Sequence, residues 1–174
     1  MGTAQNHRGK QMAEMAKVVE LLKKGELAEP RLIDNGSNYI FLVDVLWNNR
    51  ISAMAVYKPR MGEIPLWDFP TGTLYRREYA AYLLAQHLEW DFIPSTVIRE
   101  GPYGVGTVIQ YLVHDRSAHY FTLRQKHSYE FQRMCLFDII TNNADRKATH
   151  CLVDHTKRIW SIDHGLTFHV EPKL

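Results

Sequence analysis

Residues 137–153 read FDIITNNADRKATHCLV, and residues 161–168 read SIDHGLTF. The first segment begins with the pattern of an apolar helix, continues through a polar loop that contains Asp145, and ends in a short apolar run. The second segment places Asp163 after another apolar run and close to a glycine. A loop aspartate often does no more than begin or cap a turn, so the order and spacing of the two segments decide what they indicate.

The spacing of three side chains matches the demands of phosphoryl transfer. A kinase-type site needs an aspartate in a loop after a helix to orient the attacking hydroxyl. It also needs a metal ligand five positions later and a hairpin that carries a second aspartate to the metal. Asp145, His150 and Asp163 stand at these positions. The segments therefore favour a catalytic loop followed by a metal-binding turn over two unrelated capping residues.

Two further residues lie upstream in the order that this interpretation requires. Lys58 ends the apolar run AVYKP, and Glu78 lies in the helical pattern that follows. A strand lysine paired with a helix glutamate holds the α- and β-phosphates of ATP in protein kinases. The turn DNGSNY at residues 34–39 offers a glycine-bearing backbone that could approach an anion closely, although an ordinary hairpin turn has the same composition.

The composition limits the class of protein. The chain has 174 residues, of which 45% are hydrophobic and 11% aromatic, so it can bury a core as one domain or as two tightly joined lobes. The formal net charge of +2 gives no support for a nucleic-acid partner. The two cysteines do not suggest a disulfide framework, and no signal peptide or apolar run of transmembrane length is present. We expect a cytoplasmic protein without a transmembrane segment, of open oligomeric state.

Residue patterns along the chain predict an α+β fold. Apolar residues at helical spacing predict three helices, over residues 11–24, 74–88 and 128–143. Runs rich in β-branched and aromatic residues predict strands within residues 31–59 and 95–113 and a hairpin over residues 150–163. The stretch with two prolines and two glycines at residues 60–73 should be an ordered loop. Helices and antiparallel strands in this order indicate the α+β class.

The two segments quoted first resemble the catalytic and metal-binding segments of the phosphatidylinositol 3- and 4-kinase superfamily, most closely those of type II phosphatidylinositol 4-kinases. In that group the catalytic loop has the pattern N-x-D-R-x-x-x-N, and the metal-binding segment has the pattern A-I-D-N-G-L-x-F. The stretches AVYKP, PLWDFPTGTLYRRE, NNADRK and IDHGLTFHVEPKL are together similar to an uncharacterised bacterial family of phosphatidylinositol 3- and 4-kinase-like proteins. The resemblance covers most of residues 30–174.

The resemblance implies a two-lobed, protein-kinase-like fold. Residues 1–113 would form an N-lobe with an antiparallel sheet, and residues 114–174 a short, mainly helical C-lobe with a catalytic hairpin. ATP would bind in the cleft between the lobes with Mg²⁺ or Mn²⁺, and its γ-phosphate would pass to a hydroxyl of a lipid, inositol or protein acceptor.

The resemblance also implies roles for individual residues. By this resemblance, the phosphates would be bound by Gly36, Ser37, Asn38 and Lys58, and Glu78 would position the lysine. The adenine would be bound by Tyr111, Leu112 and Val113. Asp145 would be the catalytic residue, and Asp163 and His150 would bind the metal ion. Asn143 and Arg146 would shape the loop. Lys147 lies two residues after Asp145 and either adds positive charge near the transferred phosphate or is simply solvated.

The chain departs from the family pattern in two respects. His150 stands where the pattern has a metal-binding asparagine. Imidazole is a poor ligand for Mg²⁺ and suits softer divalent ions better, so we expect His150 either to bind Mn²⁺ or to leave the second metal site empty. The sequence also continues for only nine residues beyond Gly165, which implies either minimal acceptor binding or a fragment of a longer protein.

Alternatives remain at two places in the sequence. A zinc site could draw on His150, Cys151, His155, His164 and His169, but their spacing matches no usual zinc pattern. Trp67 and Phe69 could touch a membrane interface. We favour instead the packing of both rings against the helix that carries Glu78.

Three classes of function remain open. The first is a lipid or inositol kinase. The second is a protein or small-molecule kinase, because bacterial protein kinases of the HipA type share the N-x-D pattern of the catalytic loop. The third is a nucleotide-binding pseudokinase, which His150 and the short C-terminal part favour.

Overall fold

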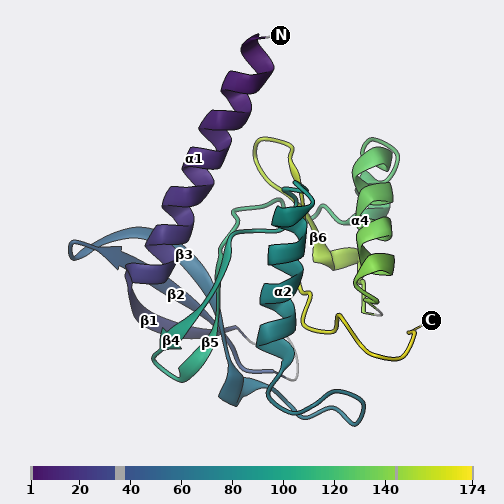
Figure 1. The fold of residues 1–174 in the computed structure, drawn as a ribbon. Coiled ribbons are helices and arrows are strands. Elements are labelled where there is room, and N and C mark those ends of the chain that lie inside the picture. Colours follow the sequence, from purple (N-terminus) through teal and green to yellow (C-terminus); the bar gives the residue numbers. More distant parts are fainter. Residues whose placement is uncertain (1, 34–37, 144, 174) are drawn as a thin grey trace. The chain divides into compact units, whose positions relative to one another are not determined.

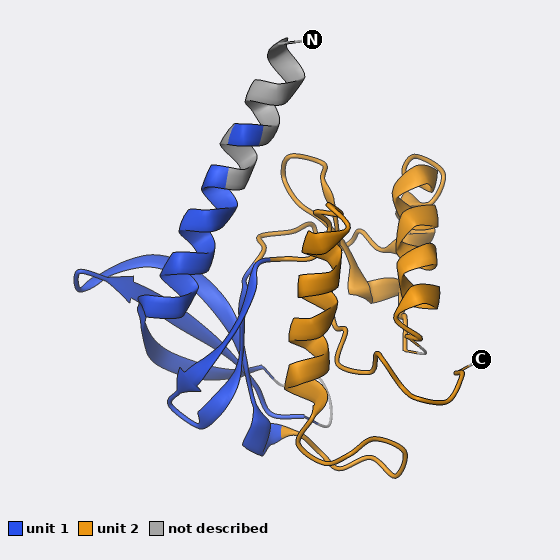
Figure 2. Ribbon diagram, viewed as in Figure 1, with its two compact units in different colours: residues 1–62, 95–111 blue, residues 63–94, 112–174 orange. Residues whose placement is uncertain are grey.

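The computed structural model describes residues 2–33, 38–143 and 145–173, with side chains of the first helix described at residue 9 and from residue 13 onward. The chain forms two compact units, each built from two stretches of sequence. One contains residues 1–62 and 95–111, and the other contains residues 63–94 and 112–174 (Figure 2). Residues 63–94 fall within the N-lobe predicted over residues 1–113, but they cluster with the C-terminal part of the chain.

The first unit is built on a five-stranded antiparallel sheet (Figure 1). Its strands are β1 (Glu26–Ile33), β2 (Ile40–Trp47), β3 (Arg50–Pro59), β4 (Thr96–Gly101) and β5 (Gly104–Gln110), in the order β1-β2-β3-β5-β4. Asn48 and Asn49 both have positive φ in the two-residue turn between β2 and β3, as a tight hairpin with asparagine in the left-handed region requires. A turn also joins β4 to β5, within the stretch predicted as a strand pair.

The edge strand β1 begins earlier than the sequence predicts. It runs through Pro30, although a proline usually argues against a strand. Its register shifts between Ala28 and Arg31, so the proline lies at an irregularity of an edge strand, where no ladder hydrogen bond from its nitrogen is needed. Arg31 then forms an ion pair with Asp44 of β2 at 2.6 Å.

The helix α1 (Gly2–Lys24) packs against the sheet through its last turns. Leu22 is fully buried in a core with Val43, Val45 and Tyr57, so the apolar spacing of the sequence marks the buried face. Gly25 ends the helix, and a Cβ at this position would lie 2.5 Å from the side chain of Val45. Arg99 of β4 donates hydrogen bonds to the carbonyls of Leu22 and Gly25 and so caps the helix.

The pairing of β3 with β5 positions Lys58. Lys58 lies opposite Thr107, and Pro59 lies opposite Gly106. A Cβ at residue 106 would lie 2.3 Å from the carbonyl oxygen of Lys58 and 2.7 Å from the Cα of Pro59. Because both are backbone atoms, only glycine lets the two strands approach this closely beside Lys58.

The second unit contains helices and a short hairpin. Its elements are α2 (Leu74–His87), α3 (Tyr120–Leu123), α4 (Ser128–Ile140), the 3-10 turn η2 (Ala148–His150), β6 (Cys151–Val153) and β7 (Ile159–Ser161); the further 3-10 turn η1 (Arg60–Gly62) belongs to the first unit. Phe137 of α4 is fully buried and meets Phe92 edge to face at 5.5 Å. The helices and the antiparallel strands confirm the predicted α+β class.

The predicted loop at residues 60–73 is ordered by its contact with α2. The carboxylate of Glu63 accepts hydrogen bonds from the backbone N–H groups of Leu74, at 3.1 Å, and Tyr75, at 2.7 Å. These donors belong to the first turn of the helix, which has no intrahelical partner for them, so Glu63 acts as a cap from outside the helix. None of the described helices is long and apolar enough to cross a membrane.

Candidate active site

The loop after α4 is shaped by the end of that helix. Asn142 has positive φ, the N–H of Asn143 bonds the carbonyl of Asp138, and the N–H of Asn142 bonds that of Ile139. This is a Schellman motif with asparagine in the left-handed position. It turns the chain directly from the helix into the loop that carries Asp145.

A partly buried ion pair joins the end of α4 to this loop. The guanidinium of Arg146 donates to both carboxylate oxygens of Asp138 at 2.8 Å, and it also donates to the carbonyl of Ile162 at 2.9 Å. Asn143 donates to Asp138 at 2.8 Å and accepts from the backbone N–H of Asp145 at 3.1 Å. Burial acts to lower the pKa of Arg146, but the hydrogen bond and charge of Asp138 outweigh it and keep that pKa raised. Asp145 is therefore presented by a loop whose backbone is held on both sides.

The side chain of Asp145 is partly exposed and forms an ion pair with Lys147 at 3.1 Å. Lys147 itself is 60% exposed. Lys147 thus lies next to the predicted catalytic carboxylate and is also solvated. The two interpretations of its position in the sequence, a charge near the transferred phosphate and a solvated lysine, therefore do not exclude each other.

Asp145, His150 and Asp163 converge on one point. One potential ligand atom from each lies within 4.8 Å of the other two. Nε2 of His150 is 3.4 Å from a carboxylate oxygen of Asp163, and Nδ1 of His150 is buried without a hydrogen-bond partner. Two carboxylates and one imidazole are a suitable donor set for a divalent cation with mixed oxygen and nitrogen preference.

The protonation state of His150 suits a ligand. Burial lowers its pKa, and the nearby charge of Asp163 opposes this only in part. The imidazole is therefore neutral at pH 7, which is the form that binds metal ions. The three residues fit a metal ion in chemistry as well as in position.

The backbone at Asp163 has φ of +62°, a conformation that is uncommon outside glycine and that costs energy unless its surroundings impose it. The next residue supplies the constraint. The N–H of His164 donates to the carboxylate of Glu78 at 3.0 Å, and Glu78 is buried in α2. Glu78 thus contacts the turn that presents Asp163.

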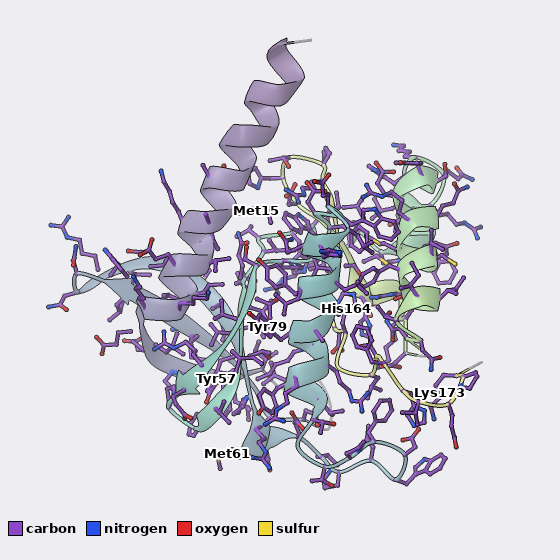
Figure 3. All side chains as sticks on the ribbon, viewed as in Figure 1. Met15, Tyr57, Met61, Tyr79, His164 and Lys173 are labelled. Atoms are coloured by element: carbon purple, nitrogen blue, oxygen red, sulfur yellow. The ribbon has the colours of Figure 1, made fainter. Side chains whose placement is uncertain are left out.

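The imidazole of His164, a residue labelled in Figure 3, is fully buried. Its ring meets that of Phe137 of α4 edge to face at 5.9 Å. Its Nε2 lies 3.0 Å from the guanidinium of Arg146 and 3.1 Å from the hydroxyl of Ser161. Because a guanidinium can only donate, Nε2 must accept, which assigns the proton of the neutral ring to Nδ1. Through Arg146, His164 therefore joins the loop that carries Asp145 to the turn that carries Asp163.

Four features of this site were not predicted from the sequence: the acceptor role of Asp138, the contact of Glu78 with His164, the contact of His164 with Arg146, and the cap at Asn142. Asp138 had one signal, since it is a charged residue within the apolar pattern CLFDII. The contacts of His164 join residues that lie far apart in the sequence and have no local pattern.

The remaining predicted site residues lie elsewhere. Lys58 belongs to β3 of the first unit and is partly buried, and Asn38 precedes β2. Gly36 and Ser37 lie outside the described residues.

The predicted adenine-binding segment lies where the chain passes from the first unit to the second. The N–H of Tyr111 donates to the carbonyl of Met54, and the carbonyl of Leu112 lies 2.8 Å from the ring of His114. Leu112 is buried, whereas Val113 is 67% exposed. Two of the backbone groups expected to face adenine thus already have protein partners.

The two local alternatives are resolved differently. Among the described residues, the one group of side chains close enough to hold a metal ion is Asp145, His150 and Asp163, so Cys151, His155, His164 and His169 do not gather around His150 as a zinc site would require. Phe69 packs under Arg77 of α2 at 4.8 Å, as predicted. The prediction was wrong for Trp67, which is 94% exposed and has the ammonium of Lys173 5.4 Å from the centre of its ring.

Known proteins resemble this chain in sequence and in fold. No protein-family model matches the chain. It is 34% identical over 189 residues to Protein Rv2133c of Mycobacterium tuberculosis, and the match covers 88% of this chain and 68% of that protein.

Two solved structures are similar in fold. The Golgi casein kinase has a TM-score of 0.56 at 16% identity, over 92% of this chain. The Helicobacter pylori proinflammatory kinase CtkA has a TM-score of 0.54 at 15% identity, over 84% of this chain. The chain spans 58% of the length of each of them. These similarities confirm the predicted protein-kinase-like fold.

Proposed function

The chain belongs to the same family as Protein Rv2133c of Mycobacterium tuberculosis, and from this premise and its kinase-like fold we propose that it is an ATP-dependent phosphotransferase. The observation that carries the proposal is the convergence of Asp145, His150 and Asp163 within 4.8 Å. These residues come from a loop after a helix, from the end of that loop and from the turn after a hairpin. That order is the one that kinase chemistry requires.

Each residue has a distinct role in this proposal. Asp145 accepts the proton of the acceptor hydroxyl and orients its oxygen toward the γ-phosphate. Asp163 and His150 hold the divalent cation, which neutralises phosphate charge when it is bound. Lys147 lies beside Asp145 and adds positive charge where the transferred group would pass. Asn143 and Arg146 hold the loop in shape.

The nucleotide would be bound by residues that the sequence resemblance assigns. Lys58 would contact the α- and β-phosphates, and the turn of Gly36, Ser37 and Asn38 would cover them. Glu78 would position Lys58, in addition to its contact with the N–H of His164. The segment Tyr111 to Val113 would bind adenine through those backbone groups that have no partner within the protein.

We propose Mn²⁺ as the preferred cation. His150 supplies a neutral nitrogen where the related pattern has an asparagine oxygen, and its pKa is lowered by burial. Mg²⁺ binds oxygen ligands and loses its water reluctantly, whereas imidazole suits softer divalent ions. A site that pairs the carboxylate of Asp163 with the imidazole of His150 should therefore discriminate in favour of Mn²⁺.

The acceptor is a hydroxyl compound of the lipid, inositol or protein class. The sequence resemblance supports a phosphatidylinositol 3- and 4-kinase-like acceptor. A protein acceptor of the kind used by HipA-type kinases is the main alternative. A nucleotide-binding pseudokinase is the second alternative, because His150 departs from the usual metal-binding residue.

Nucleotide binding and turnover, measured on the same variants, test the proposal. ATP with Mn²⁺ should raise the melting temperature of the wild type, and Lys58→Ala should abolish most of this rise. Asp145→Asn should keep the rise but lower ATP turnover by about 10²- to 10⁴-fold, the usual contribution of a positioned acid or base. Lys157→Ala, which removes an exposed lysine of the hairpin, is the matched control. Absence of nucleotide binding would contradict the proposal, and binding without turnover in the wild type would favour the pseudokinase.

A further inference from the structure

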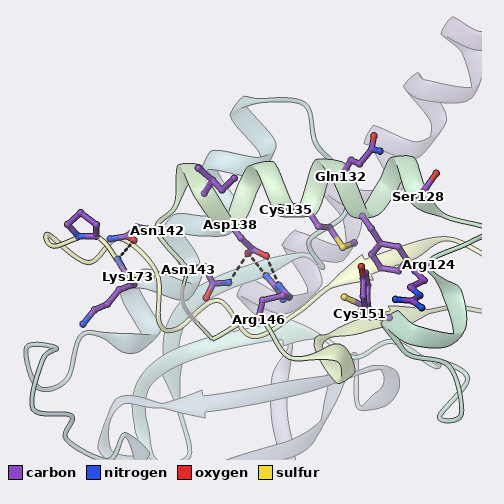
Figure 4. A pocket seen from close by; sticks show the side chains of 15 residues that line it. Arg124, Ser128, Gln132, Cys135, Asp138, Asn142, Asn143, Arg146, Cys151 and Lys173 are labelled. Carbon is purple, nitrogen blue, oxygen red and sulfur yellow. Dashed lines mark hydrogen bonds and ion pairs between the residues drawn. The ribbon is translucent and has the colours of Figure 1, made fainter.

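A cavity of about 820 Å³ lies within the second unit, between α3, α4, the catalytic loop and the C-terminal segment (Figure 4). Its volume is within the range of about 300–1,000 Å³ that is typical of sites for small organic ligands. Asp145, His150 and Asp163 do not line it. The cavity is therefore distinct from the metal site, although Asn143 and Arg146, which hold the loop of Asp145, are part of its lining. An inference about the cavity does not depend on the proposed function.

The wall of the cavity is largely apolar. Phe131 and Met134 of α4 are buried beneath it, and Ile139, on the same helix, is 71% exposed. Tyr120 of α3 lies opposite and meets Phe131 edge to face at 5.1 Å. A ligand in this position would cover Ile139 and the other parts of the apolar wall that now face water, which favours binding in proportion to the area removed from water.

The charges that line the cavity are mostly positive. Three basic side chains, Arg124, Arg146 and Lys173, face one acid, Asp138. Asp138 accepts two hydrogen bonds from Arg146 and one from Asn143, so its charge is already compensated. The residual charge of the lining is therefore positive, which complements an anion.

Arg124 is the basic residue best placed to bind an anion. Arg146 is occupied by Asp138, and Lys173 by Asp68. Arg124 is exposed, and its guanidinium lies 5.9 Å from the centre of the Phe121 ring. Among the described residues it has no carboxylate partner. A guanidinium in this state can form a bidentate pair with a carboxylate, sulfonate or phosphate.

We propose that this cavity is a binding site for a small amphipathic anion, that is, an organic molecule with an apolar body and one acidic group. The apolar body lies along Phe131, Met134 and Ile139, and the acidic group pairs with Arg124. Ser128 and Gln132 add polar groups at the margin of the cavity. Specificity follows because a ligand needs both contacts. A neutral apolar molecule cannot form the ion pair with Arg124, and a hydrophilic anion cannot pack against the apolar wall.

Two fluorescent probes that differ in one group test the proposal on the full chain. 8-Anilinonaphthalene-1-sulfonate and N-phenyl-1-naphthylamine share an apolar body, and only the first carries a sulfonate. The sulfonate probe should bind more tightly to the wild type, and Arg124→Gln should weaken it by about tenfold, the usual effect of losing one charge-assisted hydrogen bond. The neutral probe should bind the two proteins equally. Dodecanoate should displace the sulfonate probe, and dodecanol should not.

Matched variants locate the binding. Arg116→Gln removes an exposed arginine outside the cavity lining and should leave the affinity for the sulfonate probe unchanged. Asp163→Asn should also leave it unchanged, since the metal site is separate. Ile139→Glu places a negative charge at an exposed position of the wall and should weaken the sulfonate probe.

Two results would overturn the proposal. One is equal affinity of the sulfonate probe for the wild type and for Arg124→Gln. The other is a stable dimer in light scattering that Ile139→Glu converts to a monomer, because a second copy would then be the occupant of the cavity. Neither result bears on nucleotide binding or turnover, so failure here is distinguishable from failure of the proposed phosphotransferase function.

Discussion

The carboxylate of Glu78 accepts a hydrogen bond from the backbone N–H of His164 at 3.0 Å. This contact joins the middle of α2 to the residue that follows Asp163, across 86 positions of sequence. A glutamate that was predicted to position a strand lysine therefore also supports the turn that presents a predicted metal ligand. The charge of this buried carboxylate and its hydrogen bond to His164 can be separated by two substitutions.

Replacement of Glu78 by alanine should weaken both the fold and the metal site. The buried N–H of His164 would lose this acceptor, which typically costs about 1–3 kcal/mol, and Asp163 would lose a constraint on its left-handed backbone. Glu78→Gln keeps an acceptor oxygen and should retain most of the stability and the Mn²⁺ affinity. Urea denaturation and calorimetric titration with Mn²⁺ measure the two effects. Glu14→Ala, at an exposed position of α1, is the control, and equal Mn²⁺ affinity in the alanine and glutamine variants would argue against a supporting role.

Replacement of His150 by asparagine should change the preference for metal ions. The variant replaces a nitrogen ligand by an oxygen ligand, so the ratio of Mn²⁺ to Mg²⁺ affinity should fall by at least about tenfold, as is usual when a metal-binding shell is altered. Titration of each ion with the wild type and the variant gives this ratio. His155→Asn changes an exposed histidine of the same hairpin and should have no effect. An unchanged ratio in His150→Asn would show that the imidazole is not a ligand.

Replacement of Gly106 by alanine should disturb the strand that carries Lys58. The new Cβ would lie 2.3 Å from the carbonyl oxygen of Lys58, and because that atom belongs to the backbone, the two strands would have to separate. Overpacking of this kind typically costs about 1–3 kcal/mol, and ATP affinity should fall with the displacement of Lys58. Gly9→Ala, where no heavy atom lies within 4 Å, should leave both properties intact. Normal stability of Gly106→Ala in urea denaturation would contradict the close approach of β3 and β5.

Replacement of Asp154 by asparagine should reveal a dependence of stability on pH. Asp154 accepts hydrogen bonds from Thr156, Arg158 and Trp160 at the turn between β6 and β7. Burial acts to raise the pKa of Asp154, but these hydrogen bonds outweigh it and lower that pKa below its ordinary value of 3.8. A lowered pKa means that the carboxylate stabilises the fold above the ordinary pKa and that this contribution disappears as pH falls through the folded pKa.

The melting temperature of Asp154→Asn should therefore lie below that of the wild type at pH 7, by about 2–4 °C for each kcal/mol lost in a chain of this size. The difference should shrink steadily once the pH drops below 3.8. Thermal unfolding monitored by circular dichroism at several pH values measures it. A difference that stays constant across the acidic range would mean that the charge of Asp154 has no part in stability.

The local elements of this protein follow from local patterns. The apolar spacing at residues 74–88 and 128–143 predicts α2 and α4 closely, since helices with one buried face carry that period in their sequence. The tight turn at Asn48 and Asn49 is likewise marked by its residue types. The early start of β1 could not be predicted from the local residue types. Its proline is tolerated only because the strand lies at the edge of the sheet and is irregular there, and the edge position is a property of the whole sheet.

The predicted site also has features that local sequence patterns indicate and features that depend on the whole fold. The order of Asp145, His150 and Asp163 along the chain is a local property, and the structure brings the three together. The contacts that hold them are not local. Arg146 reaches Asp138 in the preceding helix and His164 after the hairpin, and a buried polar network of this kind depends on tertiary packing, which a single sequence does not display.

The interleaving of the two units along the chain has a consequence for how the molecule can be divided. The chain crosses from one unit to the other three times, near residues 62, 94 and 111. In the sheet, β5 lies between β3 and β4. Along the chain, β3 is followed first by a 32-residue stretch of the other unit, residues 63–94, then by β4, and only then by β5. No single cut in the gene can therefore release either unit whole. During synthesis on the ribosome, the sheet cannot close until Gln110 has left the exit tunnel.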